Sequence, residues 1–390
     1  MQTFRVSAQD GASVHVSHFG ALGGAEEYHL HVLPARTGGF EEQLSSLEAM
    51  YERARRQLDL DEETAVFRRV FLSDAAAQEP RVRLSGLARD EGSPLAISLV
   101  QQQPLPEMKV ALWAYHVRDR APLQKRSIPN GVAVRRGARA HLWTAGIGGS
   151  PDSAVCSSAQ TREAFQAYCQ LLADHQATLR DDVVRTWLYV QGIDLNYQGM
   201  VEARRELFAS NGLTDATHFI ASTGIEGRRA DHQRVVLLDA YAIAGVDARQ
   251  MRYLAAPEHL GPTSAYGVTF ERGTRVEHAD RVHVFISGTA SIDPAGRTLH
   301  VADVRNQIQR TFRNVEALLR DGGASGEDIA QMLVYLRDPA DRPVVEAFLA
   351  QNYAATPALL LHAPVCRPSW LVEVECIAIM PGGDPRWEPF

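Results

Sequence analysis

The sequence predicts an α+β fold of three similar β-β-α-β-α-β units that pack as a pseudo-trimer within one chain. The main observation is an internal repeat, because residues 63–74 (ETAVFRRVFLSD) match residues 327–338 (EDIAQMLVYLRD) without a gap. Residues 181–190 (DDVVRTWLYV) form a third copy. In addition, an amphipathic helix is predicted before each copy, and an apolar strand closes each unit.

The elements of the three units follow one order along the chain. Apolar residues at three- and four-residue steps predict first helices at residues 40–58, 161–179 and 304–321, and shorter helices follow at 197–210 and 343–354. The repeated strands are predicted at 66–72, 184–190 and 330–336, and the closing strands at 109–116, 234–243 and 371–380. Glycine-bearing strands are predicted before the first helices of the second and third units, at 141–149 and 282–292.

Three units imply three sheets, each with helices on one face. The other face of each sheet needs a partner, and three sheets around one axis would bury all three faces. Independent domains on linkers are the alternative, but the joins at 117–138 and 247–277 are mixed in composition, whereas flexible linkers are rich in Gly and Ser. We therefore expect units at 1–118, 139–246 and 278–382, the first of them degenerate.

Composition argues against several classes of protein. The formal net charge is −7, whereas a sequence-independent nucleic-acid binder needs a basic face. Apolar runs fall short of the roughly 18 residues of a membrane span, and the N-terminus lacks the pattern of a secretory signal. The four cysteines show no C-x-x-C pairing. We expect a soluble cytoplasmic protein without nucleic-acid or membrane partners, present as a monomer or weak homo-oligomer.

Four histidines near the N-terminus have a spacing that resembles a metal site at first sight. His15, His18, His29 and His31 are, however, spaced as on the polar faces of strands, and no cysteine or second carboxylate cluster accompanies them. The glycine-rich residues 146–150 (GIGGS) match no nucleotide-binding pattern. We therefore expect no metal site at these histidines.

Several segments resemble the YjgF-like, or reactive-intermediate deaminase, family, whose members are trimers with the chorismate-mutase-like fold. Three fused units narrow the resemblance to the chorismatases, which remove the enolpyruvyl side chain of chorismate. The resemblance covers most of the chain after about residue 120. It is carried by residues 222–227 (STGIEG), 264–273 (SAYGVTFERG), 285–291 (FISGTAS), 319–325 (LRDGGAS) and 366–378 (CRPSWLVEVECIA).

The closing strand of the third unit, LVEVECIAIM, carries the most informative residue, Glu373. Alternation along a strand puts Glu373 and Glu375 on one face. The closing strand of the first unit has no carboxylate, and that of the second has only Asp239. Spacing alone leaves two interpretations open, a solvent-facing edge with salt-bridging glutamates or a single site surviving from a threefold ancestor. The resemblance implies that Glu373 is the catalytic acid. Glu375 remains the lesser alternative, because we expect it to lie nearer to solvent.

Chorismate carries two carboxylates, so a binder with a net negative charge needs local cations. The planar fork of arginine suits carboxylates, although most arginines are solvated surface groups. Arg272 and Tyr266 both lie in the segment of residues 262–273. The resemblance implies that Tyr266 reaches the ligand, and the alternative is that Tyr266 packs in the core. The arginines near the resembling segments are Arg204, Arg252, Arg272 and Arg367, of which we predict Arg204, Arg272 and Arg367 to bind substrate.

Small residues are predicted to form the walls of the pocket. A glycine in a strand, such as Gly288, allows close approach of a ligand, or else marks a bulge. Thr223 and Gly224 hold a similar place in the second unit, with a plain turn as the alternative. Cys366 would otherwise be a small buried apolar residue. The resemblance associates Cys366 with formation of 3-hydroxybenzoate, whereas Ala290 departs from the glycine of that type.

The resemblance implies cleavage of chorismate to pyruvate and 3-hydroxybenzoate, with or without 4-hydroxybenzoate, as in secondary metabolism. It also implies that the reaction needs neither a metal nor an organic cofactor. Hydrolysis to pyruvate and a dihydroxycyclohexadiene carboxylate is a second outcome. An imine or enamine deaminase remains an alternative, but the parent family would have arginine where this chain has Leu359. A non-catalytic metabolite-binding protein is a third possibility, because two of the units lack the glutamate.

Overall fold

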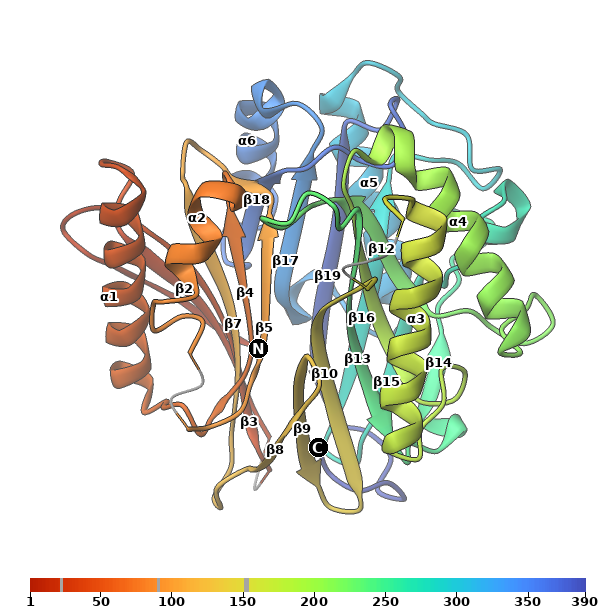
Figure 1. Ribbon diagram of the computed structural model, residues 1–390, viewed down its shortest axis with the longest axis horizontal. Coiled ribbons are helices and arrows are strands. Elements are labelled where there is room, and N and C mark those ends of the chain that lie inside the picture. The colour runs from red at the N-terminus through yellow and green to blue at the C-terminus, as the bar shows by residue number, and fades with distance from the viewer. Residues whose placement is uncertain (22–23, 90–91, 151–153) are drawn as a thin grey trace.

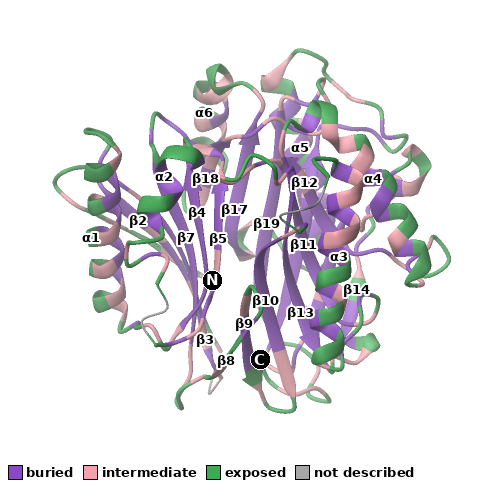
Figure 2. Ribbon diagram, viewed as in Figure 1, coloured by how far each residue is buried: buried purple, intermediate pink, exposed green. Residues whose placement is uncertain are grey.

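The computed structural model describes residues 1–21, 24–89, 92–150 and 154–390. Three sheets stand around a common interior, and the helices cover their outer faces (Figure 1). The inner strands are almost wholly buried, whereas the edge strands at residues 2–7 and 124–128 and the outward turns of the helices are largely exposed (Figure 2). The predicted α+β pseudo-trimer is therefore confirmed.

The first sheet is covered by α1 (Phe40–Leu58) and α2 (Ala75–Val82). At the start of α1 the Glu42 carboxylate accepts a hydrogen bond from the Gly39 N–H, at 2.6 Å, which is half of a capping box. In spatial order its strands are β1 (Gln2–Ser7), β2 (Ser13–Gly20), β3 (Glu26–Leu33), β7 (Val110–Arg118), β4 (Ala65–Leu72) and β5 (Ala96–Gln101).

The second sheet is covered by α3 (Ser157–Asp174) and α4 (Ile193–Ser210). Two of its strands precede residue 139, where the second unit was expected to start, so the sheet extends into the first join. In spatial order its strands are β12 (Ala221–Glu226), β11 (Val183–Val190), β13 (Val236–Ala244), β10 (Arg139–Gly148), β9 (Gly131–Arg136) and β8 (Gln124–Ile128).

The third sheet packs against α5 (Val304–Asp321), and α6 (Arg342–Asn352) packs against α5. The Asp303 carboxylate caps α5 by accepting the Asn306 N–H at 3.1 Å. Short 3₁₀ turns are η1 (Ala248–Gln250), η2 (Thr263–Tyr266), η3 (Gly326–Asp328) and η4 (Pro339–Asp341). In spatial order the strands are β14 (Met251–Tyr253), β15 (Gly273–Glu277), β16 (Arg281–Ala290), β19 (Val372–Pro381), β17 (Ile329–Leu336), β18 (Ala358–His362) and β6 (Gln103–Pro104).

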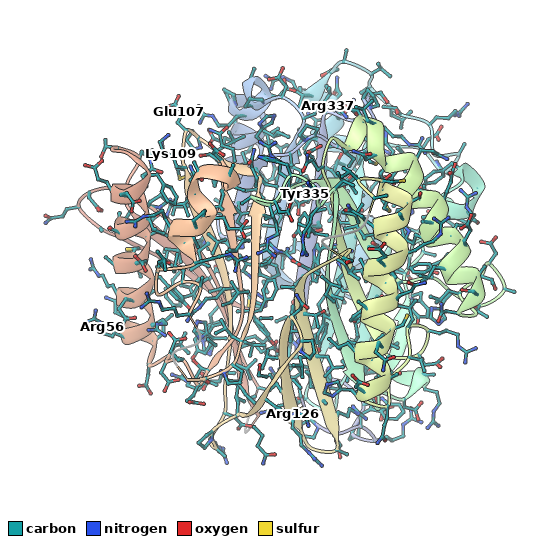
Figure 3. All side chains as sticks on the ribbon, in the orientation of Figure 1. Arg56, Glu107, Lys109, Arg126, Tyr335 and Arg337 are labelled. Atoms are coloured by element: carbon teal, nitrogen blue, oxygen red, sulfur yellow. The ribbon has the colours of Figure 1, made fainter. Side chains whose placement is uncertain are left out.

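The repeated strands β4, β11 and β17 hold the same place in the three sheets. Each lies between an antiparallel closing strand and a parallel strand that was not expected from the sequence (β5, β12 or β18). Their matched residues Phe71, Tyr189 and Tyr335 are all buried, and Tyr335 lies near the middle of the view in Figure 3. The threefold pattern of the sequence is thus a threefold pattern in space.

Each pair of sheets is joined by a buried ion pair between an arginine and a carboxylate. Removing one partner of such a pair leaves an uncompensated buried charge, which typically costs about 3–5 kcal/mol. These contacts therefore hold the units in register around the interior. The pairs are Arg69–Asp239 (2.9 Å), Arg185–Glu375 (2.7 Å) and Arg281–Glu27 (2.6 Å).

The expectation that His29 and His31 lie on a polar strand face is wrong. Both are buried, because β3 is an inner strand with other sheets packed over it. The Trp113 Nε1–H donates to His29 Nδ1 at 3.1 Å, and the ring of Tyr115 stacks on that of His29. In the part of the chain that the structure describes, no group of three or more His, Cys, Asp or Glu side chains could hold a metal ion.

None of the helices within the described ranges combines the length and the apolar character that crossing a bilayer requires.

Candidate active site

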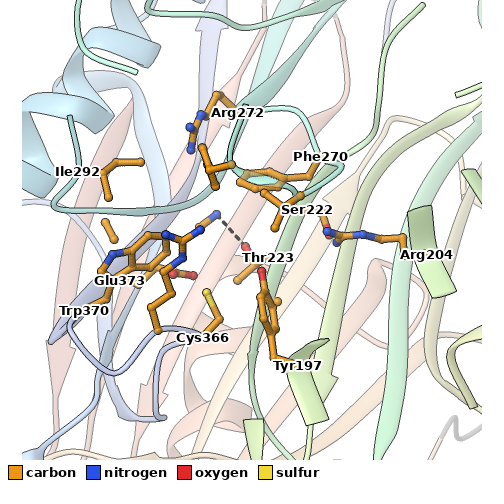
Figure 4. Close-up of a pocket in the computed structure, with 16 residues that line it drawn as sticks. Tyr197, Arg204, Ser222, Thr223, Phe270, Arg272, Ile292, Cys366, Trp370 and Glu373 are labelled. Carbon is orange, nitrogen blue, oxygen red and sulfur yellow. Dashed lines mark hydrogen bonds between the residues drawn. The ribbon is translucent and has the colours of Figure 1, made fainter. Parts of the chain in front are cut away.

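A pocket lies between the second and third units, walled by α4 and β12 on one side and by β16, β19 and the segment before β19 on the other (Figure 4). Residues 266–272, in the second join, complete the wall. The structure brings every site residue predicted from the sequence into this pocket: Glu373, Cys366, Tyr266, Arg272, Arg204, Gly288, Ala290, Thr223, Gly224 and Arg367.

Glu373 lies on β19, an inner strand of the third sheet, and its side chain is buried. A solvent-facing edge is therefore ruled out for this residue. Gly288 on β16 makes room for the carboxyl group, because a Cβ at position 288 would lie 2.1 Å from Glu373 Oε1. Burial raises the pKa of Glu373 to about 8, the charge of Glu375 adds to the rise, and Arg185 opposes it. At neutral pH this carboxyl group therefore carries a proton.

The expectation that Glu375 lies nearer to solvent is wrong. Its side chain is 2% exposed, because the second sheet packs over this face of the third. Arg185 Nη2 donates to it at 2.7 Å, Trp187 Nε1–H donates at 2.8 Å, and the Thr223 hydroxyl donates as well. Glu375 is thus an anchored carboxylate beneath the pocket, and it does not line it.

Three arginines face the pocket without a carboxylate partner among the described residues. Burial lowers the pKa of Arg204 and of Arg272, and the Nε of each is buried without a hydrogen-bond partner. Arg367 lies over the rings of Tyr266 (5.0 Å) and Trp370 (5.1 Å). Such buried guanidinium groups favour an anionic ligand. Arg252 is outside the pocket and pairs with Asp321 at 3.0 Å.

Cys366 and Tyr197 form one corner of the pocket. Burial raises the pKa of Cys366 to about 12, so that the thiol is neutral at ordinary pH. Tyr197 was not predicted as a site residue, because an aromatic residue on an amphipathic helix looks like a core residue. The other lining residues not predicted are Ser222, Val268, Phe270, Ile292 and Trp370.

Thr223 and Gly224 lie on β12, not in a turn. Thr223 Oγ1 accepts the Gly288 N–H at 2.9 Å, which is the dashed bond in Figure 4. Since β12 belongs to the second sheet and β16 to the third, this bond joins two units at the pocket wall. The site therefore exists only in the assembled pseudo-trimer.

The acid has no counterpart in the other two units. Glu373 pairs across the ladder with Tyr335, and the matched pairs are Leu237 with Tyr189 and Ala111 with Phe71. At the interface of the first two sheets, the guanidinium of Arg229 comes within 2.6 Å of where a Cβ on Gly146 would lie, and it pairs with Glu79 at 2.8 Å. An internal ion pair therefore occupies the equivalent region there.

The fold is that of three fused YjgF-like units. Residues 275–380 match the family described as Endoribonuclease L-PSP. The chain is 28% identical over 125 residues to a RutC family protein of Pyrococcus abyssi, covering 32% of this chain and 90% of that protein. It is 26% identical over 102 residues to the 3-aminoacrylate deaminase RutC of Acinetobacter baylyi, covering 26% and 80%.

The three-unit arrangement itself has a solved counterpart. A crystal structure of chorismatase superposes with a TM-score of 0.63 and 20% identity, covering 81% of this chain and 93% of that one. The chain therefore has the chorismatase fold, and the resemblance read from the sequence is confirmed at the level of the fold.

Proposed function

We propose that this protein cleaves chorismate and releases pyruvate. The observation that carries the proposal is a buried carboxyl group, Glu373, in one pocket with three arginines that have no carboxylate partner among the described residues, and burial raises the pKa of this carboxyl group. Chorismate offers the matching chemistry, because it has two carboxylates and an enol ether whose methylene carbon can accept a proton. The fold shared with a chorismatase supports the same conclusion.

Binding is assigned to the cationic wall. Arg204, Arg272 and Arg367 hold the two substrate carboxylates, and Tyr266 contributes its hydroxyl, which is buried without a partner. Charge-assisted bonds of this kind are about twice as strong as neutral ones. Filling the pocket also expels water, which strengthens each of these contacts.

Glu373 acts as the general acid. It donates its proton to the methylene carbon of the enolpyruvyl group, which leaves an oxocarbenium-like ion stabilised by the substrate's own carboxylate. A carboxyl group with a pKa of about 8 suits this step, because the acid must be protonated near neutral pH and yet give up its proton in the transition state.

The ion has two routes to products. When water attacks, its proton returns to Glu373, and the products are pyruvate and a dihydroxycyclohexadiene carboxylate. When the ring hydroxyl displaces the side chain, the hydroxyl proton returns to Glu373, and aromatisation gives hydroxybenzoate plus pyruvate. We favour the second route with 3-hydroxybenzoate as the main product, because the neutral Cys366 thiol lines the pocket and narrows the space in which water could act.

The deaminase alternative lacks support in the pocket. The parent deaminase family would have arginine where this chain has Leu359. Leu359 is a buried residue of β18 and is not among the residues that line the pocket. The relatives named as RutC proteins align with about a third of this chain or less, and the family model matches residues 275–380.

Incubation of the purified protein with chorismate tests the proposal. Release of pyruvate, measured with lactate dehydrogenase, together with chromatography of the aromatic products, is the expected result. If chorismate stays intact while an enamine such as 2-aminoacrylate is hydrolysed, the protein is a deaminase and the proposal is wrong. If neither compound reacts, the catalytic assignment is wrong.

A further inference from the structure

Glu375, the second glutamate of the closing strand β19, lies two residues after the acid Glu373. Two residues apart on one strand, Glu373 and Glu375 project from the same face. Both are buried in the interface of the second and third sheets. Yet Glu375 accepts bonds from Arg185, Trp187 and Thr223, whereas no hydrogen bond to the Glu373 carboxyl group occurs in the described part of the chain.

The donors nearest to Glu373 are already engaged by this network. The Thr223 hydroxyl donates to Glu375, and its oxygen accepts the N–H of Gly288, the residue that lies against the Glu373 carboxyl group. Arg185 Nη2 donates to both Glu375 and Thr223. An ionised Glu373 would therefore lie beside a negative charge, and the donors of Thr223, Gly288 and Arg185 described above would already be engaged. Both conditions favour the protonated form of Glu373.

We propose that Glu375 is a positioning residue for the acid: it holds the donors of this wall and a fixed negative charge beside Glu373, and so keeps the proton on Glu373 until substrate arrives. The inference deepens the proposed function and rests on it for its catalytic consequence. Its effect on the Glu373 proton is independent of any reaction.

Other charged or titratable groups face Glu373 as well. Glu375 on the same strand raises the pKa of Glu373, and Arg185 on β11 lowers it. The remaining groups around it do not replace Glu375, because each is neutral at ordinary pH or is a cation that favours the ionised form. They are Tyr335 on β17, Tyr197 on α4, Cys366 before β19, and the pocket arginines Arg204, Arg272 and Arg367.

The interface of the first two sheets supplies a matched control. There Asp239 accepts from Arg69 at 2.9 Å, from the Ser98 hydroxyl at 2.6 Å and from the Gly146 N–H at 2.7 Å. This carboxylate has the same kind of partners as Glu375, but Leu237 stands where the acid would be. Asp239→Asn therefore perturbs a comparable buried network without an acid beside it.

The test compares the pH dependence of kcat/KM for pyruvate release in Glu375→Gln, Glu375→Asp and Asp239→Asn. In Glu375→Gln the alkaline limb should move to lower pH by about one to two pH units. Glu375→Asp keeps the charge and should keep the limb of the wild type, as should Asp239→Asn. An unshifted limb in Glu375→Gln, or an equal shift in Asp239→Asn, would overturn the inference.

A second measurement needs no activity. The free energy of unfolding of each protein, with and without Glu373→Gln, reports the titration of Glu373 through its pH dependence. The pH range over which the stability curves with and without Glu373→Gln diverge should end at lower pH in the Glu375→Gln background. If Glu375→Gln does not fold, Thr223→Val takes its place, because it removes the acceptor of the Gly288 N–H, and the same shift is expected. An unchanged window overturns the inference. Failure of the wild type to cleave chorismate overturns only the proposed function.

Discussion

Gly288 and Glu373 share one space: a Cβ on Gly288 would lie 2.1 Å from the Glu373 carboxyl oxygen and 2.9 Å from its carboxyl carbon. The two residues come from neighbouring strands of the third sheet, where β16 is irregular between Ile286 and Thr289. The glycine is thus required by the position of the acid, and this explains why a strand at the centre of a sheet carries a residue that strands usually avoid.

Gly288→Ala should displace the carboxyl group and lower kcat/KM by about 10²-fold, because a 1 Å misplacement of a catalytic group has that order of effect. Steady-state measurement of pyruvate release checks it. Gly86→Ala is the control, since the nearest atom to its Cβ would be the flexible Glu48 carboxylate at 3.4 Å. Activity of Gly288→Ala within twofold of the wild type would mean that Glu373 does not need its present position.

Arg272→Gln should raise the KM for chorismate by about 10- to 100-fold, since a hydrogen bond to a charged group is worth about 1.5–3 kcal/mol. Titration of initial rates against substrate concentration measures the change. Arg252→Gln is the matched control, because this arginine lies outside the pocket and pairs with Asp321. Equal effects of the two variants would show that Arg272 does not contact the substrate.

The proton on Glu373 should also be visible in stability. Its carboxyl group titrates near 4.5 when unfolded and near 8 when folded, so between these values the folded state holds a proton that the unfolded state has lost. Raising the pH from 4.5 to 8 should therefore destabilise the wild type relative to Glu373→Gln, by an amount of the order of a few kcal/mol.

Denaturant titrations of both proteins at a series of pH values measure this difference. Below pH 4.5 and above pH 8 the difference should stay constant. A difference that is constant from 4.5 to 8 would show that Glu373 ionises like an ordinary carboxyl group, in which case it could not serve as the acid near neutral pH.

Cys366→Ala should change the products more than the rate. Removal of the sulfur enlarges the pocket toward the volume that one water molecule occupies in the liquid, about 30 Å³. The mixture should shift from 3-hydroxybenzoate toward the dihydroxy acid or 4-hydroxybenzoate, with pyruvate release largely kept. Chromatography of the products decides it, and an unchanged ratio would make Cys366 a packing residue.

Most of the architecture could be predicted because repetition amplifies weak signals. One strand such as β17 is ambiguous alone, but its copies β4 and β11 fix the unit. The parallel strands β5, β12 and β18 were missed because they are short, and β5 and β12 also carry polar residues such as Ser98 and Thr223. These same polar residues bind the buried carboxylates Asp239 and Glu375.

The site was predicted in part for a different reason. Residues in strands with unusual features, such as Gly288 and Glu373, stand out against the apolar background. Tyr197 does not, because nothing in a helix sequence distinguishes an aromatic residue facing a pocket from one facing the core. The burial of Glu375 could not be predicted either, since it depends on the second sheet, which supplies Arg185 and Trp187 across a sequence separation of about 190 residues.

The most direct test of the account is pyruvate release from chorismate by the wild type and by Glu373→Gln at neutral pH. The amide keeps the shape of the side chain but has no acidic proton, so the rate should fall by about 10²–10⁴-fold. Glu258→Gln, a change at an exposed carboxylate, should leave the rate unaltered. Release of pyruvate at the wild-type rate by Glu373→Gln would contradict the assignment of Glu373 as the general acid.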